Sequence, residues 1–267
     1  MMNDYKNLDL SLEDHTAVIT LKRPEMMNAL NRELTQEFHQ VIETIGHKFP
    51  QIRAVILTGQ GRGFCSGADL SRMASQGSEN RRDSVVRGRS GKRIQELAPA
   101  LRNLPQPVIA AVNGAAVGAG LSIALASDIR IASSGARFSA IFVRRGLVPD
   151  TAASSTIMAI SGHAVAAEMS LTGRIYDADW AFQNGLVSKV VSSEDLMSEA
   201  IALAEEISLN PPLAVQNTKK LMRQVMPDWH DVIANEDDAG DPMYGTKDQL
   251  EAVSAFLEKR NPSYTGE

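Results

Sequence analysis

Short apolar runs alternate with stretches of helical spacing along the first half of the chain. AVILT at 54–58 and PVIAAV at 107–112 have the length and the β-branched content of buried strands, and 7–21 predicts two further short strands around a Glu-Asp-His turn. Apolar residues recur every three or four positions across 28–45, which predicts an amphipathic helix. Strands that alternate with helices in this way predict parallel β-α units.

Two of these strands lead into loops of small residues. The loops are GQGRGFCSGAD at 59–69 and NGAAVGAG at 113–120, and each opens into a predicted helix. Backbone N–H groups in so bare a loop can approach a ligand closely, and the following helix adds the positive end of its dipole. The pattern therefore indicates an oxyanion or anion site, although close packing of a helix on a strand would need the same small residues.

Helical patterns dominate the second half of the chain. The remaining elements of the predicted core are a strand at 129–132, helices beginning at 151 and at 163–171 and 178–184, and a short strand at 185–191. After residue 193 the strand patterns end, and helices are predicted at 193–209, 212–226 and 247–259. We therefore expect a core that spans 1–192 and a C-terminal helical region, 193–267, that serves in assembly.

Composition narrows the class of protein. The chain has 267 residues, 43% of them hydrophobic, which is enough for a full core. Its net charge of −5 argues against a dedicated nucleic-acid binder. Its one cysteine, Cys65, permits neither an intramolecular disulfide nor a cysteine-based metal cluster, and we expect no metal site. The polar N-terminus and the lack of any apolar run of membrane-spanning length predict a cytoplasmic protein.

The segment 74–94 is polar and rich in arginine. It could be a solvated surface segment or a flexible wall of the ligand site. In the second case its arginines could meet phosphate groups: Arg81, Arg82, Arg87 and Arg89.

Motifs spread over nearly the whole chain resemble those of a known family. They are RPEMMNAL at 23–30, GRGFCSGADL at 61–70, PVIAAVNGAAVGAG at 107–120, ASDIRIAS at 126–133, GLVPD at 146–150, LTGRIYDADWAFQNGLVSKVV at 171–191 and AFLEKRNP at 255–262. In content and order they resemble the motifs of the enoyl-CoA hydratase/isomerase, or crotonase, superfamily. The resemblance implies an α/β fold, a crotonase-like spiral of repeated ββα units with a C-terminal helical trimerisation region. It also implies a homotrimer or a dimer of trimers.

The same resemblance implies an acyl-CoA thioester as the substrate, with coenzyme A as part of the substrate and no separate cofactor. The carbonyl oxygen of the thioester would lie between two backbone N–H groups, which the motifs assign to Ala68 in SGAD and Ala119 in VGAG. Further substrate contacts are implied at Lys22, Arg23, Ser66, Gly67, Asp69, Leu70 and Gly118. Lys22 and Arg23 suit phosphate but could also be solvated loop charges, and Asp69 could instead brace its helix.

Both glutamates that family hydratases use are absent. The motifs place them at Ser122 and Phe142, so the sequence argues against ordinary hydratase activity. Asp150, in GLVPD, stands where some family isomerases carry a catalytic acidic residue. One carboxylate suffices to move a proton from one carbon to another if a mostly apolar site raises its pKa. Alternatively, Asp150 caps the helix that begins at Thr151.

These observations favour an enoyl-CoA isomerase with Asp150 as acid and base. A first alternative is a hydratase-like lyase that uses an unplaced carboxylate, for which the options are Glu79, Asp83 and Glu96. A second is a non-catalytic member that binds acyl-CoA or RNA. A nucleophilic Ser122 lacks a motif-placed histidine to activate it. The histidines fall in turns or on helix surfaces: His15, His39, His47, His163 and His230.

Overall fold

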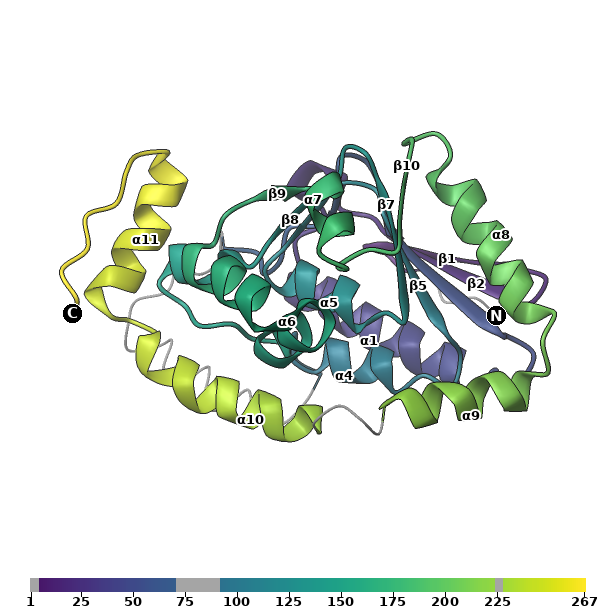
Figure 1. Ribbon diagram of the computed structural model, residues 1–267. Coiled ribbons are helices and arrows are strands. Elements are labelled where there is room, and N and C mark those ends of the chain that lie inside the picture. The colour runs from purple at the N-terminus through teal and green to yellow at the C-terminus, as the bar shows by residue number, and fades with distance from the viewer. Residues whose placement is uncertain (1–4, 71–91, 224–227) are drawn as a thin grey trace.

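The computed structural model describes residues 5–70, 92–223 and 228–267, and two β-sheets run through it (Figure 1). The larger sheet has the strand order β1-β2-β3-β5-β7-β10. Its strands are β1 (Leu8–Glu13), β2 (Thr16–Leu21), β3 (Ala54–Gly59), β5 (Val108–Val112), β7 (Ile129–Ser133) and β10 (Lys189–Val191). β1 and β2 are the two strands expected in 7–21; they pair antiparallel, and the later pairings in this sheet are parallel.

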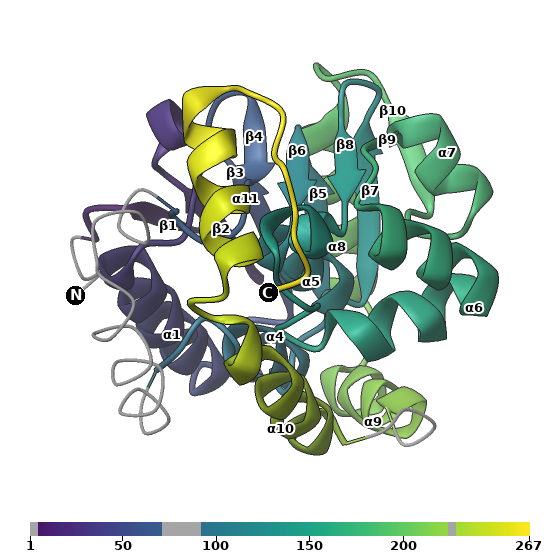
Figure 2. The same ribbon diagram turned by 90° about the vertical axis from the view of Figure 1, so that its left-hand side faces the viewer.

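The smaller sheet has the order β4-β6-β8-β9, and Figure 2 shows β4, β6 and β8 side by side. Its strands are β4 (Gly63–Cys65), β6 (Ala115–Val117), β8 (Arg137–Ser139) and β9 (Tyr176–Asp177). The chain passes from the larger sheet to the smaller at β3 to β4, β5 to β6 and β7 to β8, so the same unit recurs along a spiral. β4 and β6 lie inside the stretches predicted as bare loops, because strands of three residues leave no periodicity to recognise.

Helices fill the connections and most of the C-terminal part. The described helices are α1 (Arg32–Gly46), α4 (Leu97–Arg102), α5 (Ala119–Ala126), α6 (Ala153–Thr172), α7 (Ala178–Gln183), α8 (Leu196–Ser208), α9 (Pro212–Arg223), α10 (Trp229–Gly240) and α11 (Lys247–Glu258), with 3-10 turns η1 (Pro24–Met26), η2 (Ile141–Arg145) and η3 (Asp241–Met243). α1 begins at Arg32 rather than at residue 28 because Asn31 caps it, accepting a hydrogen bond from the Leu34 amide at 2.8 Å. α6 is interrupted at Gly162, which agrees with the two helices predicted there.

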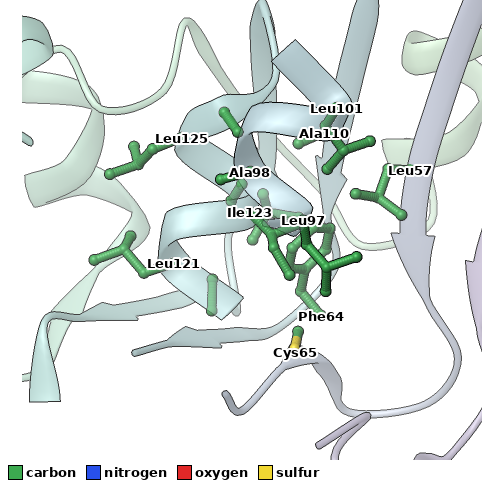
Figure 3. Packing of buried hydrophobic residues seen from close by; sticks show 14 of the residues in the cluster. Leu57, Phe64, Cys65, Leu97, Ala98, Leu101, Ala110, Leu121, Ile123 and Leu125 are labelled. Atoms are coloured by element: carbon green, nitrogen blue, oxygen red, sulfur yellow. The ribbon is translucent and has the colours of Figure 1, made fainter. Parts of the chain in front are cut away.

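The main hydrophobic core lies on one face of the larger sheet. Figure 3 shows Phe64 of β4 packed with Leu97 of α4 and Ile123 of α5. All eight residues of α5 are buried, which explains why this helix is apolar all round rather than amphipathic. Because this core holds α5 in place, it also fixes the position of residues 113–118, which lead into the helix.

A second core covers the opposite face of the larger sheet. Figure 1 shows α8 on the side of the strands away from α5. Alternate residues of β3 divide between the cores, with Ile56 facing Leu196, Ala200 and Ala204 of α8. α8 thus builds part of the core, whereas the sequence assigned the residues after 193 to assembly alone.

The rest of the C-terminal region is attached by both polar and apolar contacts. Lys219 of α9 is buried, and its Nζ donates to the Gln106 carbonyl at 2.7 Å and pairs with Asp128 at 2.5 Å. α10 was not predicted from the sequence, because an acidic stretch breaks its apolar pattern and the helix depends on packing of Trp229 and Ile233. No helix in the described ranges is long and apolar enough to cross a membrane.

One sequence expectation about the histidines is wrong. His39 was expected on the surface of α1, but it is only 8% exposed and its Nε2 lies 2.9 Å from the Arg93 carbonyl oxygen. The chain that enters α4 covers this face of α1. Burial also lowers the pKa of His39 below its usual value.

Candidate active site

The two small-residue loops lie in direct contact. Gly67 has φ +89°, and a Cβ atom on it would lie 2.8 Å from the Val117 carbonyl oxygen and 3.4 Å from the Ala119 nitrogen. A Cβ atom on Gly120 would lie 2.0 Å from the Cys65 carbonyl oxygen. Neither approach is compatible with a side chain, so glycine at both positions lets the loops touch.

The contact brings two amides together, those of Ala68 and Ala119. Ala119 is the first residue of α5, so its N–H has no helical carbonyl to bond. Within the described part of the chain, the Ala68 N–H also makes no hydrogen bond. The backbone around Ala68 is fixed nonetheless, because the Leu30 amide bonds to the Gly67 carbonyl at 2.8 Å and the Asp69 amide bonds to the Leu30 carbonyl at 3.0 Å. Both donors are thus held in place and available to an acceptor.

Polar side chains brace the first of these loops. Arg23 forms an ion pair with Asp69, with 3.0 Å between Nη2 and Oδ2, and both side chains are largely buried. The Arg23 guanidinium also donates to the Ala29 carbonyl oxygen. Ser66 Oγ donates to the Met26 carbonyl at 3.2 Å. The guanidinium therefore acts within the protein, and Asp69 has the bracing partner that the sequence left as an alternative.

The other expected substrate contacts sit at the rim of the same region. Lys22 pairs with Asp9 at 2.9 Å, and its side chain is 43% exposed, so its ammonium remains accessible. Leu70 is partly buried, and Gly118 has φ +55° where the chain enters α5. A role in holding coenzyme A stays a prediction for each of them.

The two residues that replace the hydratase glutamates adjoin the second loop. Phe142 is buried, and a Cβ atom on Gly118 would lie 3.9 Å from its Cε1. Ser122 is 1% exposed, and its hydroxyl contacts the carbonyl oxygens of Gly118 at 3.3 Å and Asp150 at 3.2 Å. A serine whose hydroxyl donates to carbonyls is not activated as a nucleophile. It ties α5 to the segment that carries Asp150.

Asp150 lies in a pocket of about 240 Å³. Apolar walls come from Ile94, Leu147 and Val148. The other polar side chains that line the pocket are Arg93, Gln95, Glu236, Asp237, Asp241 and Tyr244. Burial raises the pKa of Asp150 to about 7, against a hydrogen bond from Thr151 Oγ1 at 2.9 Å that lowers it, and the like charges of Glu236 and Asp237 raise it further. Near neutral pH the carboxyl group can both lose and regain a proton.

Asp150 does not cap α6, so the capping interpretation of this residue is wrong. Glu236, from α10, does so instead. The Ala152 amide donates to Glu236 Oε2 at 2.8 Å, and the Ser154 amide donates to Oε1 at 2.9 Å. Only the backbone carbonyl of Asp150 takes part in the helix start, as the acceptor for the Ala153 amide at 3.0 Å. No sequence signal pointed to Glu236, since it lies far along the chain in a helix that the pattern did not predict.

The unplaced carboxylates of the hydratase-like alternative gain no support. Glu79 and Asp83 lie outside the described residues. Glu96 lies 3.3 Å from Arg93 Nη2, and it does not line the pocket that contains Asp150. Asp128 has a structural role, because its Oδ2 accepts a hydrogen bond from the Val108 amide at 2.7 Å and pairs with Lys219.

Known proteins resemble the chain over nearly its whole length. The family model described as enoyl-CoA hydratase/isomerase matches residues 12–267. The chain is 38% identical over 259 residues to a short-chain-enoyl-CoA hydratase of Clostridium acetobutylicum, covering 96% of this chain and 97% of that protein. It is 33% identical over 257 residues to a 1,2-epoxyphenylacetyl-CoA isomerase of Escherichia coli K12, covering 96% and 97%.

Solved structures of this family also resemble the fold of the chain. The crystal structure of an enoyl-CoA hydratase/isomerase from Pseudoalteromonas atlantica has a TM-score of 0.86 and 33% identity to this chain, over 97% of this chain and 100% of that one. This likeness covers both the spiral and the C-terminal helices and confirms the crotonase-type fold expected from the motifs. By motif order, by family model and by structure, the chain belongs to the enoyl-CoA hydratase/isomerase family.

Proposed function

We propose that this protein is an enoyl-CoA isomerase that moves a double bond along the acyl chain of a coenzyme A thioester. The observation that carries the proposal is Asp150. Its carboxyl group has a pKa raised to about 7 and lines a partly apolar pocket. It does not cap α6, because Glu236 accepts the hydrogen bonds from the amides at the start of that helix. The two positions at which family hydratases carry glutamate hold Ser122 and Phe142 instead.

In this proposal the Ala68 and Ala119 amides bind the thioester oxygen. Negative charge develops on that oxygen when a proton leaves the neighbouring carbon, and each fixed donor stabilises it by about 3 kcal/mol in comparable sites. Because both donors belong to the main chain, the side chains at these positions matter only by staying small. The contact between the loops at Gly67 supports a shared acceptor for the two amides.

Asp150 then carries the proton. Its carboxylate takes a proton from C2 of a 3-enoyl thioester, which leaves a dienolate on the oxygen bound by the amides. The same carboxyl group, now protonated, gives that proton to C4, and the double bond ends between C2 and C3. A pKa of about 7 suits both halves of this exchange.

We also propose how the protein binds coenzyme A and how its subunits associate. Lys22 would meet the phosphates of coenzyme A, since its ammonium is accessible. Subunits would associate as a trimer or a dimer of trimers, an idea supported by exposed apolar side chains on the C-terminal helices: Leu213, Leu221, Met222, Phe256 and Leu257. A cytoplasmic location and the absence of a nucleic-acid partner stay predictions.

Hydration is the second candidate, because the relative from Clostridium acetobutylicum is named a hydratase. It would require a second carboxylate beside Asp150. Glu236 lines the same pocket, but both of its oxygens accept hydrogen bonds from the start of α6, so it is poorly placed to serve as a second base.

One assay separates these candidates. The purified full chain is incubated with 2-enoyl and 3-enoyl-CoA esters of several chain lengths, and both double-bond migration and water addition are followed. Asp150→Asn keeps the size of the side chain and removes the base. Isomerase function predicts migration that collapses in this variant while binding of the ester persists. Efficient formation of 3-hydroxyacyl-CoA, or migration unaffected by the substitution, would overturn the proposal.

A further inference from the structure

The backbone immediately after Asp150 is held in an unusual conformation. Thr151 has φ +57° and Ala152 has φ +63°, so two successive residues other than glycine lie in the left-handed region. A residue with a side chain is disfavoured there relative to the right-handed conformation, because its Cβ atom comes too close to the following carbonyl oxygen. Both residues are completely buried. The surrounding structure must therefore supply what keeps this turn in place.

The carboxylate of Glu236 supplies it from the far side of the turn. Oε2 accepts from the Ala152 amide at 2.8 Å, while Oε1 accepts from the Ser154 amide at 2.9 Å and from Ser154 Oγ at 2.5 Å. The side chain is 7% exposed and faces the positive end of the α6 dipole. Figure 1 shows α10, which carries Glu236, along the lower side of the molecule next to α6. One charged group thus accepts hydrogen bonds from two amides at the start of α6.

Asp150 itself is fixed from the other direction. Its carbonyl oxygen accepts from the Ala153 amide at 3.0 Å and from Ser122 Oγ at 3.2 Å. Its Oδ1 accepts a hydrogen bond from the Thr151 hydroxyl at 2.9 Å. The direction of the carboxyl group therefore follows from the dihedral angles of the turn, and the Glu236 contacts maintain those angles.

We infer that Glu236 is a positioning residue: its carboxylate locks the turn at residues 151–152 and thereby directs the Asp150 carboxyl group into the pocket. The inference rests on the proposed role of Asp150. It assigns a part in catalysis to a helix of the C-terminal region, which the sequence indicated only for assembly. Loss of the contact would leave the pocket in place and would misdirect its acid.

Charge adds a second consequence. The groups that face Asp150 are Glu236 and Asp237 of α10, Asp241 and Tyr244 beyond it, and Arg93 before α4. Arg93 is paired with Asp237 at 3.0 Å, so Glu236 is the carboxylate of α10 on this pocket without a cationic partner among the described residues. Its like charge disfavours ionisation of Asp150. Removing that charge shifts the titration of Asp150 to lower pH.

Glu236→Gln tests the inference in the full chain. Glutamine has the same size but only one acceptor oxygen where the turn uses two, and its NH₂ group opposes an amide donor. We expect kcat for isomerisation to fall about 10²-fold with KM within a factor of three, because misplacing a catalytic group costs rate rather than binding. The acid limb of the pH-rate profile should move to lower pH. Asp231→Asn, which removes one exposed charge from the same helix, is the matched control and should change neither.

A second substitution separates positioning from general stability. Glycine adopts positive φ without cost, so Ala152→Gly relieves the turn of its need for Glu236. When it is combined with Glu236→Gln, kcat should rise about tenfold above that of Glu236→Gln alone, because the turn then keeps its conformation with less help from the side chain at 236. A Glu236→Gln variant with unchanged kcat and pH profile would overturn the inference. So would a loss of kcat that Ala152→Gly leaves untouched.

A direct titration keeps the inference testable if the protein proves not to be an isomerase. The infrared carbonyl band of a protonated carboxyl group, assigned to Asp150 as the band that disappears in Asp150→Asn, reports its protonation without any turnover. A midpoint that falls in Glu236→Gln supports the coupling even where isomerisation is absent, in which case the proposed function alone fails. An unchanged midpoint would overturn the coupling.

Discussion

Substituting Gly67 by alanine should separate the two loops that carry the Ala68 and Ala119 amides. The new methyl group would lie 2.8 Å from the Val117 carbonyl oxygen, which is closer than carbon and oxygen tolerate, and 3.4 Å from the Ala119 nitrogen. Its φ of +89° adds a cost of about 1–2 kcal/mol for a residue with a side chain. Overpacking of this kind costs about 1–3 kcal/mol more, so the total is about 2–5 kcal/mol.

Gly162 provides a matched control for the conformational part of that cost. It has φ +77° and no atom within 4 Å of the position that a Cβ atom would take. With ψ at 170° the residue lies in a region that is essentially restricted to glycine, so Gly162→Ala should cost about 1–3 kcal/mol of stability and leave kcat unchanged. The difference between the two variants isolates the contact between the loops.

Thermal unfolding and single-substrate kinetics measure the two effects at one protein concentration. We expect Gly67→Ala to lower the thermal midpoint further than Gly162→Ala, by about 2–4 °C for each additional kcal/mol. We expect its kcat on a 3-enoyl-CoA to fall about 10²-fold, because one amide is moved away from the other. If the two variants lose equal stability and Gly67→Ala retains its kcat, the loops do not form a shared oxyanion site.

The remaining predictions concern Asp150 and the attachment of α9. Because Asp150 acts first as a base and its pKa is about 7, kcat/KM for isomerisation should rise with pH through about 7 and then level off; a profile flat between pH 5 and 9 would contradict this role, the range being roughly two pH units to either side. The same raised pKa means that the folded state binds the proton more tightly than the unfolded state, so stability is lost as pH rises from about 4 to 7. Asp150→Asn should therefore have a higher thermal midpoint than wild type at about pH 8 and the same midpoint at about pH 4, when measured by differential scanning calorimetry. Lys219→Met removes the ammonium group that pairs with Asp128 and should cost about 3 kcal/mol in urea unfolding, while adding Asp128→Asn should recover part of this loss; additive losses would contradict a coupled pair.

Much of the spiral could be predicted from the sequence. The strands β3 and β5 are continuous apolar runs because both of their faces are buried, and the two loops of small residues follow them directly. Local patterning carries this information. β4, β6 and β9 were beyond reach because strands of two or three residues are defined only by the neighbours with which they pair.

The two roles open to Asp150 could not be separated by local pattern. Pro149 followed by Asp150 before a helix is a good capping sequence, and nothing nearby argues against it. The answer comes from Glu236 of α10, which bonds to the start of the same helix although it lies 82 positions after Ser154 in the sequence. Such a contact depends on how the C-terminal helices pack. His39 shows the same limit on a smaller scale, because its burial follows from the segment that covers α1.

Transfer of an isotope tests the central claim most directly. A 3-enoyl-CoA that carries deuterium at C2 is converted to a small extent by the wild-type chain and by Asp150→Asn, and the position of the label in the product is determined. If Asp150 carries one proton from C2 to C4, the wild type forms 2-enoyl-CoA with deuterium at C4, and Asp150→Asn forms almost none. A 3-hydroxyacyl-CoA as the main product, or a variant that isomerises at the wild-type rate, would contradict the account.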